Sequence, residues 1–251
     1  MSDVRIFLNG CNGRMGKVIT DICSQEQGIL IVAGADANAS PSSFPVYASA
    51  ADCKEEFDVI IDFSHVLALP GIMRLAAARN VPLVMCTTGL SDDDKKALTS
   101  LSEKTAVFYS ANMSLGVNVL INLVQKAAYI LYPGFDIEIV EAHHNQKLDA
   151  PSGTALMIAD AVNDTLDHQL EYVYDRHNVR QKRGAREIGI HSIRGGSIVG
   201  DHSVIFAGPE ELLTISHSAQ TRNVFARGAV AAALFMCGKT TGMYSMKDLI
   251  N

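Results

Sequence analysis

A turn with three glycines constrains the fold of this chain more than any other feature. Gly10, Gly13 and Gly16 follow a short apolar strand at 4–8 and open an amphipathic helical pattern. A second apolar strand, 29–33, ends near Asp36, twenty residues after Gly16. Strand, glycine turn, helix, strand and acid is the order of a dinucleotide-binding (Rossmann) unit. In such a unit the backbone meets the pyrophosphate at the helix N-terminus and the acid binds a ribose diol. The pattern predicts a pyridine-nucleotide site.

The details of this turn bear on which nucleotide binds. The turn departs from the standard glycine pattern because position 12 is Asn, and an ordinary strand–helix turn is the alternative. The placement of Asp36 favours the nucleotide site. Asp36 is followed by Ala37, and no basic residue stands close behind it in the sequence. The Asp36 carboxylate would repel a 2′-phosphate. We therefore expect NAD(H) to be preferred, with NADP(H) possible. Arg14, in the turn, could reach a 2′-phosphate from the other side.

The rest of the first half alternates strands and helices. Apolar strands at 57–63, 82–86 and 106–109 are separated by helical patterns at 71–79 and 92–104. Such alternation predicts a doubly wound parallel sheet, with ligands at the carboxyl ends of the strands. The loops there are expected to line the nicotinamide half of the pocket, although each alone could be a polar turn. The predicted cofactor contacts are Gly10, Cys11, Asn12, Gly13, Arg14, Met15, Asp36, Phe63, Ser64, Cys86, Thr87, Thr88, Ser110, Ala111, Asn112 and Met113.

The segment 141–155 concentrates ionisable groups at a helix start. A strand with period-2 alternation at 135–139 continues toward His143 and His144, which should face opposite sides. Pro151 disfavours helix at the preceding residue, and Ser152 is a good N-cap for an apolar helix behind it. The N–H groups of the first helical turn near Gly153 and Thr154, with the helix dipole behind them, would form a site for a carboxylate or phosphate.

The charges in this segment suggest catalysis. Lys147 adds a mobile positive charge beside the helix start. A structural or metal-binding histidine pair is the alternative, but no cysteine lies nearby and a metal would need a third suitable ligand. We therefore predict no metal. The combination of two imidazoles, a lysine and a helix N-terminus favours a site that holds an anionic substrate and hands it a proton.

The second half is predicted to form another domain. An apolar helix at 115–132 ends at Pro133-Gly134, and the charged stretch 167–187 is expected to be a solvated loop or a subunit contact. Segments 188–193, 197–207 and 212–218 alternate like antiparallel strands, and a helix at 224–237 is expected to return to the first domain. The fold class is thus α/β: a Rossmann-type parallel sheet plus an α+β domain with an open, mainly antiparallel sheet. Such a sheet commonly needs a partner surface, which suggests oligomerisation.

These patterns define two domains. Residues 1–114, completed by 224–251, are predicted to bind the dinucleotide, and 115–223 to bind substrate and mediate oligomerisation. Five widely spaced cysteines without a C-x-x-C pair favour reduced thiols in a cytoplasm. The start, 1–5, shows no signal-peptide pattern, and no apolar run reaches membrane-spanning length. A net charge of −6 without a basic stripe argues against nucleic acid as a partner.

Nearly the whole chain resembles the dihydrodipicolinate reductase (4-hydroxy-tetrahydrodipicolinate reductase) family of bacterial and plant lysine biosynthesis. The most specific piece is Glu141-Ala142-His143-His144, Lys147 and Asp149 through Ala155. Further matching pieces are Gly13-Arg14-Met15-Gly16, Asp62-Phe63-Ser64, Thr87-Thr88-Gly89, Ala111-Asn112-Met113-Ser114, Arg194, Gly200, His202, His217 and Phe225 to Ala229.

The resemblance implies hydride transfer from a nicotinamide cofactor to a cyclic imine dicarboxylate in lysine and diaminopimelate biosynthesis. It implies that His143 donates and accepts a proton and that Lys147 is a second proton donor. It implies that His144, Gly153 and Thr154, with Ser152, hold a substrate carboxylate, and that the chain forms a homotetramer through the second sheet.

The chain departs from the family pattern in three ways. Cys86 stands where glycine is usual, which suggests a tighter nicotinamide loop. Asn145 and Gln146 replace residues that are often basic, which lowers the local positive charge. Ala37 stands where a base accompanies NADP use, in agreement with the NAD preference.

Two other functions remain open at this point. One is a different two-domain amino-acid dehydrogenase, such as a homoserine or diaminopimelate dehydrogenase. The other is a non-catalytic protein that senses NADH and binds a partner. A sensor has no need for His143, Lys147 and the helix start at Ser152 together.

Overall fold

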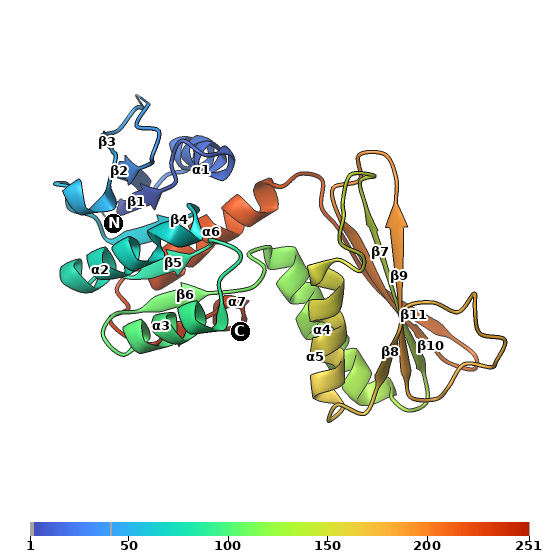
Figure 1. Cartoon of the computed structure of the whole chain (residues 1–251). Coiled ribbons are helices and arrows are strands. Elements are labelled where there is room, and N and C mark those ends of the chain that lie inside the picture. The colour runs from blue at the N-terminus through green and yellow to red at the C-terminus, as the bar shows by residue number, and fades with distance from the viewer. Residues whose placement is uncertain (1–2, 41, 251) are drawn as a thin grey trace. The chain divides into compact units, whose positions relative to one another are not determined.

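The computed structural model describes residues 3–40 and 42–250 and contains two compact units. Unit 1 comprises Met1–Leu115 and Asn223–Asn251, and unit 2 comprises Gly116–Arg222 (Figure 1). Residues 1–2 and 251, which the predictions for the start at 1–5 and for the first domain include, lie outside the described residues. The assignment of the cofactor to one domain and of substrate and oligomerisation to the other remains a proposal.

Unit 1 is built on a seven-stranded sheet in the order β12-β6-β5-β4-β1-β2-β3, and its neighbouring strands are all parallel. The chain therefore runs outward from β1 in both directions, which places a change of strand order between β1 and β4. The strands are β1 (Val4–Asn9), β2 (Ile29–Ala35), β3 (Val46–Tyr47), β4 (Val59–Asp62), β5 (Leu83–Met85), β6 (Val107–Tyr109) and β12 (Met243–Tyr244).

Helices cover both faces of this sheet (Figure 1). Alternate side chains of β1 enter different cores: Ile6 and Leu8 pack with residues of α1 and α6, while Phe7 packs with residues of α2 and α3. The helical segments of unit 1 are α1 (Arg14–Gln25), α2 (Leu69–Arg79), α3 (Asp92–Ser102), α6 (Asn223–Met236), α7 (Met246–Ile250) and the 3₁₀ turns η1 (Ala50–Asp52) and η2 (Val66–Ala68). The parallel sheet with helices on both faces confirms the predicted fold class, and α6 returns to unit 1 as expected.

Unit 2 is a five-stranded sheet in the order β11-β10-β7-β9-β8 with two helices on one face. Its elements are α4 (Leu115–Leu131), β7 (Asp136–His143), α5 (Gly153–Thr165), β8 (Glu171–Val173), β9 (Glu187–Arg194), β10 (Asp201–Ala207) and β11 (Leu212–Ser218). Inward side chains of β7, such as Ile137 and Ile139, pack with α4 and α5. The α+β character and the open face of the sheet are as predicted.

The strand order of unit 2 corrects one expectation. The predicted segments 188–193 and 197–207 are expected to be antiparallel neighbours, but β7 lies between the corresponding strands β9 and β10. β7 pairs in parallel with β9 and antiparallel with β10, so the sheet is mixed rather than mainly antiparallel. The physical reason is that β7 has an apolar inward face that is best buried at the centre of the sheet. Local alternation does not reveal such long-range pairing.

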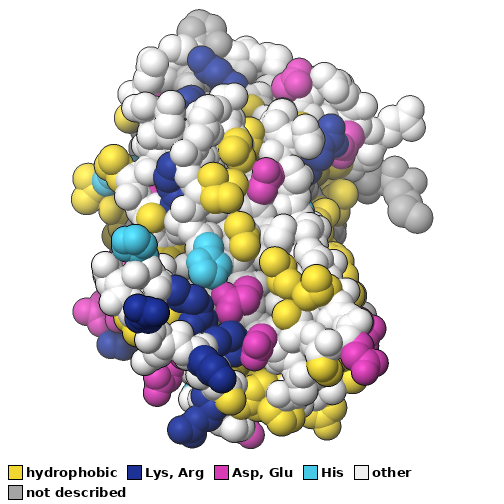
Figure 2. Space-filling model, turned by 90° about the vertical axis from the view of Figure 1, so that its right-hand side faces the viewer, with side chains coloured by type: hydrophobic (Ala, Val, Ile, Leu, Met, Phe, Trp, Pro, Cys, Tyr) yellow, Lys and Arg dark blue, Asp and Glu magenta, His cyan; other side chains and the backbone are white. Residues whose placement is uncertain are grey.

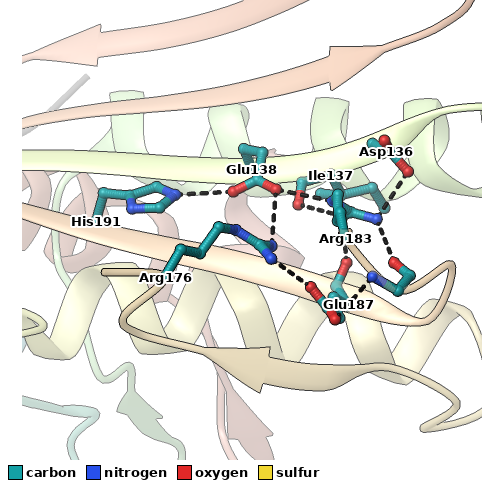
Figure 3. A network of polar contacts seen from close by, with 8 residues as sticks. Asp136, Ile137, Glu138, Arg176, Arg183, Glu187 and His191 are labelled. Atoms are coloured by element: carbon teal, nitrogen blue, oxygen red, sulfur yellow. Dashed lines mark hydrogen bonds and ion pairs between the residues drawn. The ribbon is translucent and has the colours of Figure 1, made fainter. Parts of the chain in front are cut away.

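The charged stretch 167–187 is more ordered than predicted. It contains the short strand β8, and two of its arginines bond to Glu138 of β7 (Figure 3). Arg183 donates to Glu138 over 2.9 Å and to Asp136 over 2.7 Å, and Arg176 pairs with Glu187 over 2.7 Å. The remaining bases, Arg180, Lys182 and Arg186, are exposed as a solvated loop requires.

The face of the unit 2 sheet away from the helices is mixed in character. Strand register places Leu212, Ile193, Ser203 and the Glu138–His191 pair on that face, and the first two are 70% and 51% exposed. A view of one face of the molecule shows hydrophobic, histidine, basic and acidic side chains interspersed (Figure 2). Within residues 3–40 and 42–250, no helix has the length and apolarity to cross a membrane.

Candidate active site

The glycine turn of unit 1 is shaped for close backbone approach. Gly10 adopts a positive φ of 79°, and a Cβ there would collide with the carbonyl oxygen of Phe63. A Cβ at Gly16 would collide with the carbonyl oxygen of Gly10. Helix α1 then begins at Arg14 after Gly13, whose lack of a side chain leaves the first helical N–H groups uncapped. Uncapped N–H groups at a helix start fit a pyrophosphate.

Asp36 lies at the end of β2, where a ribose-binding acid is expected. One carboxylate oxygen accepts from the Asn12 N–H over 3.0 Å and the other from the Asn38 N–H over 2.9 Å. The Asn12 side chain donates in turn to the carbonyls of Asn38 and Ser40. Asn12, which breaks the glycine pattern, therefore ties the glycine turn to the loop that follows Asp36.

A buried carboxylate, Asp62, joins three strand ends in unit 1. It is 1% exposed and accepts from Asn9 over 2.7 Å, from the Ser64 hydroxyl over 2.6 Å and from the Thr87 hydroxyl over 2.7 Å. Thr87 Oγ1 also accepts from the Ser64 N–H over 3.1 Å. Burial raises the pKa of Asp62 although these hydrogen bonds act in the opposite direction. Asp62 was noted in the sequence only as part of a loop, but it holds the predicted Ser64 and Thr87 loops together.

The other predicted cofactor residues divide by exposure. The side chains of Cys11, Cys86 and Met113 are buried in the core, so only their backbone atoms are available to a ligand. Burial raises the pKa of the Cys11 thiol to about 11 and that of Cys86 well above its usual value. Asn112 is buried and accepts from the Ser114 N–H. Arg14, Thr88 and Ala111 are exposed, and Met15 and Ser110 are half-buried.

A pocket of about 810 Å³ lies within unit 1. The predicted residues that line it are Gly10, Gly13, Asp36, Phe63 and Ser64. The pocket is also lined by residues of the turn η1 and of α2, among them Gly71, Arg74, Leu75 and Ala78. Arg74 is exposed and was not identified from the sequence, because a lone base on a surface helix carries no local signal. The pocket has the size and the acid, glycine and helix-start groups that the adenosine half of a dinucleotide requires.

In unit 2, His143 belongs to a charged cluster at the end of β7. His143 is 9% exposed, and its Nδ1 lies 2.6 Å from Oε2 of Glu141, which is fully buried. Arg194 of β9 donates to both Glu141 oxygens, over 2.8 and 2.9 Å. Burial alone would raise the pKa of Glu141, but the hydrogen bonds from Arg194 and His143 lower it to about 2. An ionised carboxylate only accepts, so His143 Nδ1 is a donor and Nε2 is its chemically free nitrogen.

Gly200 lies beside Nε2 of His143. A Cβ at Gly200 would lie 3.1 Å from this nitrogen. Because His143 is buried, a residue larger than glycine at position 200 would crowd Nε2.

The start of helix α5 is fixed by the same cluster. Ser152 caps the helix, its hydroxyl accepting from the Ala155 N–H over 3.1 Å as predicted. The Ser152 N–H donates to Glu141 over 3.1 Å, and its hydroxyl lies 3.1 Å from Nε2 of His202. Burial, together with the neighbouring His143, lowers the pKa of His202 to about 4, so it is neutral near pH 7.

The remaining predicted residues surround this cluster. Lys147 is held by Asp149, with Nζ 2.8 Å from Oδ1, and the pKa of Asp149 is lowered by this contact. His144 is half-buried, with Nε2 3.4 Å from Arg222. Gly153 is exposed, with open space where a Cβ would stand, while Thr154 is half-buried. In the described part of the chain, no group of three or more His, Cys, Asp or Glu side chains is arranged to hold a metal ion.

Three contributors to this cluster were not predicted as site residues. Glu141 stands two residues before His143 on one strand, and the period of 2 could have placed both on one face. Arg194 and His202 come from other strands, 53 and 61 residues from Glu141 in sequence. Nothing local indicates that they meet Glu141 or Ser152.

Comparison with known sequences assigns the family. The family descriptions "Dihydrodipicolinate reductase, N-terminus" and "Dihydrodipicolinate reductase, C-terminus" match residues 4–113 and 116–250. The chain belongs to the dihydrodipicolinate reductase family. It is 53% identical over 247 residues to the 4-hydroxy-tetrahydrodipicolinate reductase of Caldanaerobacter subterraneus subsp. tengcongensis, with 98% of each chain covered. It is 47% identical to that of Clostridium tetani, covering 99% of this chain and 97% of the relative.

Solved structures show the same fold. A dipicolinate-bound dihydrodipicolinate reductase from Paenisporosarcina sp. TG-14 superposes with a TM-score of 0.83 at 24% identity, covering 99% of this chain and 100% of that one. An oxidoreductase from Agrobacterium radiobacter in complex with NAD⁺ superposes with a TM-score of 0.61 at 13% identity, covering 99% of this chain and 93% of that one. The two-domain dehydrogenase architecture is therefore shared well beyond this family.

Proposed function

We propose that this chain reduces 4-hydroxy-tetrahydrodipicolinate, or its dehydrated imine, to tetrahydrodipicolinate in lysine and diaminopimelate biosynthesis. Full-length identities of 53% and 47% to reductases of that name support the proposal. The single observation that carries it is the Glu141–His143 cluster beside the start of α5, which joins a proton carrier to an anion-binding helix terminus. A reduced nicotinamide, when bound, supplies the hydride.

His143 is proposed to carry the proton of the reaction. Hydride addition to an imine leaves charge that a proton must quench, and imidazole exchanges protons near neutral pH. Nδ1 is engaged by Glu141, so Nε2, which lies beside Gly200, is the nitrogen proposed to face the substrate. Lys147 is proposed as a second proton donor. Its contact with Asp149 keeps the ammonium near the site until a substrate carboxylate competes for it.

The substrate carboxylates are proposed to bind at the start of α5. Ser152 is engaged by Glu141 and His202, which fixes the direction of the first helical turn. The N–H groups of Gly153 and Thr154, with the helix dipole, then face an anion. Exposed Gly153 allows close approach, and His144 adds a polar contact. Departures at Asn145 and Gln146 lower the positive charge in the adjacent loop, where both side chains are exposed.

The cofactor is proposed to be NAD(H) in preference to NADP(H). Asp36 lines the pocket, and its charge disfavours a 2′-phosphate. Arg74 also lines the pocket and offers a compensating charge, which supports residual use of NADP(H). Arg14 is exposed at the start of α1 and is the other candidate base.

The assembly is proposed to be a homotetramer formed through the open face of the unit 2 sheet. The exposed Leu212 and Ile193 on that face support a contact between copies. Sedimentation of the wild type and of Ile193→Glu tests this, with a tetramer converted to smaller species as the expected result. A monomeric wild type would contradict the assembly. The enzyme is proposed to work in the cytoplasm, which the unpaired cysteines support.

Steady-state reduction of enzymatically generated substrate, with NADH and NADPH side by side, tests the reaction. We expect turnover with both cofactors and a higher kcat/KM with NADH. Homoserine and diaminopimelate serve as alternative substrates for the related two-domain dehydrogenases. Turnover of one of these and none of the cyclic imine would overturn the proposal.

A binding measurement separates an enzyme from an NADH sensor. Pyridine-2,6-dicarboxylate, a flat mimic of the substrate, should raise the melting temperature when NADH is present. A sensor would respond to NADH alone and show neither this shift nor turnover.

A further inference from the structure

The Glu141 carboxylate is shared by two potential cations in unit 2. Oε2 lies 2.6 Å from His143 Nδ1 and 2.9 Å from Arg194 Nη1. Oε1 accepts from Arg194 Nη2 over 2.8 Å and from the Ser152 N–H over 3.1 Å. Glu141 is fully buried, so these partners replace its hydration. The single negative charge of Glu141 thus contacts His143, the Arg194 guanidinium and the start of α5.

Two cations that share one anion compete for its electrostatic effect. A carboxylate in contact with an imidazole favours the imidazolium form. Arg194 is permanently charged and meets both oxygens of Glu141, so it neutralises much of the field that Glu141 exerts on His143. The guanidinium is also itself a positive charge near the imidazole. Both effects of Arg194 oppose protonation of His143, while Glu141 favours it.

We infer that Glu141 and Arg194 set the proton affinity of His143 in opposite directions, with Arg194 a positioning residue that acts through Glu141. The inference rests on the proposed role of His143 in the reaction and adds two residues that tune it.

Arg194 also connects this cluster to the second proposed proton donor. Its Nη2 donates to the carbonyl oxygen of Asp149 over 2.6 Å, and Asp149 Oδ1 holds Lys147 Nζ at 2.8 Å. The Glu141–Arg194 pair therefore contacts the residues that position His143, Ser152 and Lys147. Loss of either partner should disturb more than one functional group.

The other ionisable groups near His143 come from neighbouring elements. His202 of β10 packs edge-on with a ring-centroid distance of 5.2 Å, and it is neutral near pH 7 because burial and the adjacent His143 lower its pKa to about 4. Asp201 of β10 and His217 of β11 act on His202. Lys147 and Asp149 of the following loop form their own pair. Glu141 acts on His202 and Arg194 acts on Asp149, so each variant also changes the charge near one of these groups.

The test is an NMR titration of the His143 ring in full-length protein, paired with the pH profile of kcat/KM. His143→Gln identifies the His143 signal among the eight histidines. Glu141→Gln should move the titration midpoint to lower pH by roughly one unit, because an opposite charge in contact is removed. Arg194→Met should move it to higher pH by a similar amount. The titration midpoint of the double variant should lie between those of the two single variants. The pH at which kcat/KM changes should follow the same order among the variants.

Shifts of both single variants in the same direction, or no shift in either, would overturn the inference. A purely structural role predicts loss of signal dispersion or of activity without opposite shifts. Where Arg194→Met does not fold, Arg194→Lys keeps the charge but meets only one oxygen, and a smaller shift to higher pH is expected. Lack of that shift also overturns the inference. The NMR readout needs no turnover, so a failure of the proposed reaction and a failure of this inference are distinguished.

Discussion

Each unit contains a buried carboxylate, and the two carboxylates differ in the partners that replace their hydration. Asp62 in unit 1 meets only neutral donors from Asn9, Ser64 and Thr87, and burial raises its pKa. Glu141 in unit 2 meets Arg194 and a potential imidazolium, and its pKa falls to about 2. Neutral donors such as those around Asp62 hold the loops in place but do little to stabilise the ionised form of the carboxyl group. Cationic partners fix the charge, and that charge then acts on neighbouring groups.

The difference matches what each region is proposed to do. Unit 1 presents backbone N–H groups at the start of α1, and Asp62 keeps the loops at the strand ends in register. Unit 2 presents ionisable side chains, so its carboxylate supplies electrostatics as well as geometry. This matches the proposal that unit 1 binds the cofactor and that unit 2 transfers the proton.

The largest expected effect is on the free energy of unfolding when each of the two carboxylates is replaced by its neutral amide. Glu141→Gln should destabilise the protein by about 3 kcal/mol, because Arg194 keeps its charge in a partly buried position without a counter-charge. Asp62→Asn should cost about 1 kcal/mol, since its hydroxyl partners can reverse their hydrogen bonds. Urea denaturation followed by circular dichroism measures both. Equal costs would remove the distinction between the two regions.

Acid should weaken unit 2 in two stages. His202 has a pKa lowered to about 4, so the unfolded chain binds a proton that the native protein does not between about pH 6.5 and 4. As the pH falls through that window, the free energy of unfolding therefore decreases by on the order of 3 kcal/mol. The stability from Glu141 is retained until lower pH and is lost toward about 2.

Replacement of His202 tests the first stage. His202→Gln should flatten the decline of the melting temperature between pH 6.5 and 4, with a residual slope from His217, whose pKa is also lowered by burial. Asn145→Gln, in the exposed loop, serves as a control with an unchanged decline. An unaltered slope in His202→Gln would show that this histidine does not titrate as described.

The smallest effect is expected at the rim of the unit 1 pocket. Arg74 is exposed, so its charge is screened by water and salt. Arg74→Ala should lower kcat/KM for NADPH about fivefold, as for an exposed ion pair of about 1 kcal/mol, and leave NADH use unchanged. Kinetics with both cofactors at two salt concentrations measure this. An equal loss with NADH would assign Arg74 to a part of the nucleotide that both cofactors share.

The sequence predicted best what local patterns encode. The glycine turn, Asp36 and the run of apolar strands in unit 1 define its parallel sheet, and the Ser152 cap defines the start of α5. The insertion of β7 between β9 and β10 was missed because register is set by pairing across the sheet. The short strand β8 was missed within a charged stretch whose composition is typical of a loop.

The candidate site was predicted through residues that lie close together in the sequence and not through their partners on distant strands. His143 and Lys147 stand in one continuous segment, and their residue types indicate proton transfer. Arg194 reaches Glu141 from a strand 53 residues away, and Asn9 reaches Asp62 across a similar separation. Such contacts arise from tertiary folding and have no local sequence signal.

The central claim is that His143 carries the proton in reduction of the cyclic imine. The most direct measurement is turnover of His143→Gln with enzymatically generated substrate, alongside NADH affinity from fluorescence titration. We predict a fall in kcat of roughly 10²–10⁴-fold with NADH affinity unchanged. Turnover equal to that of the wild type would contradict the account.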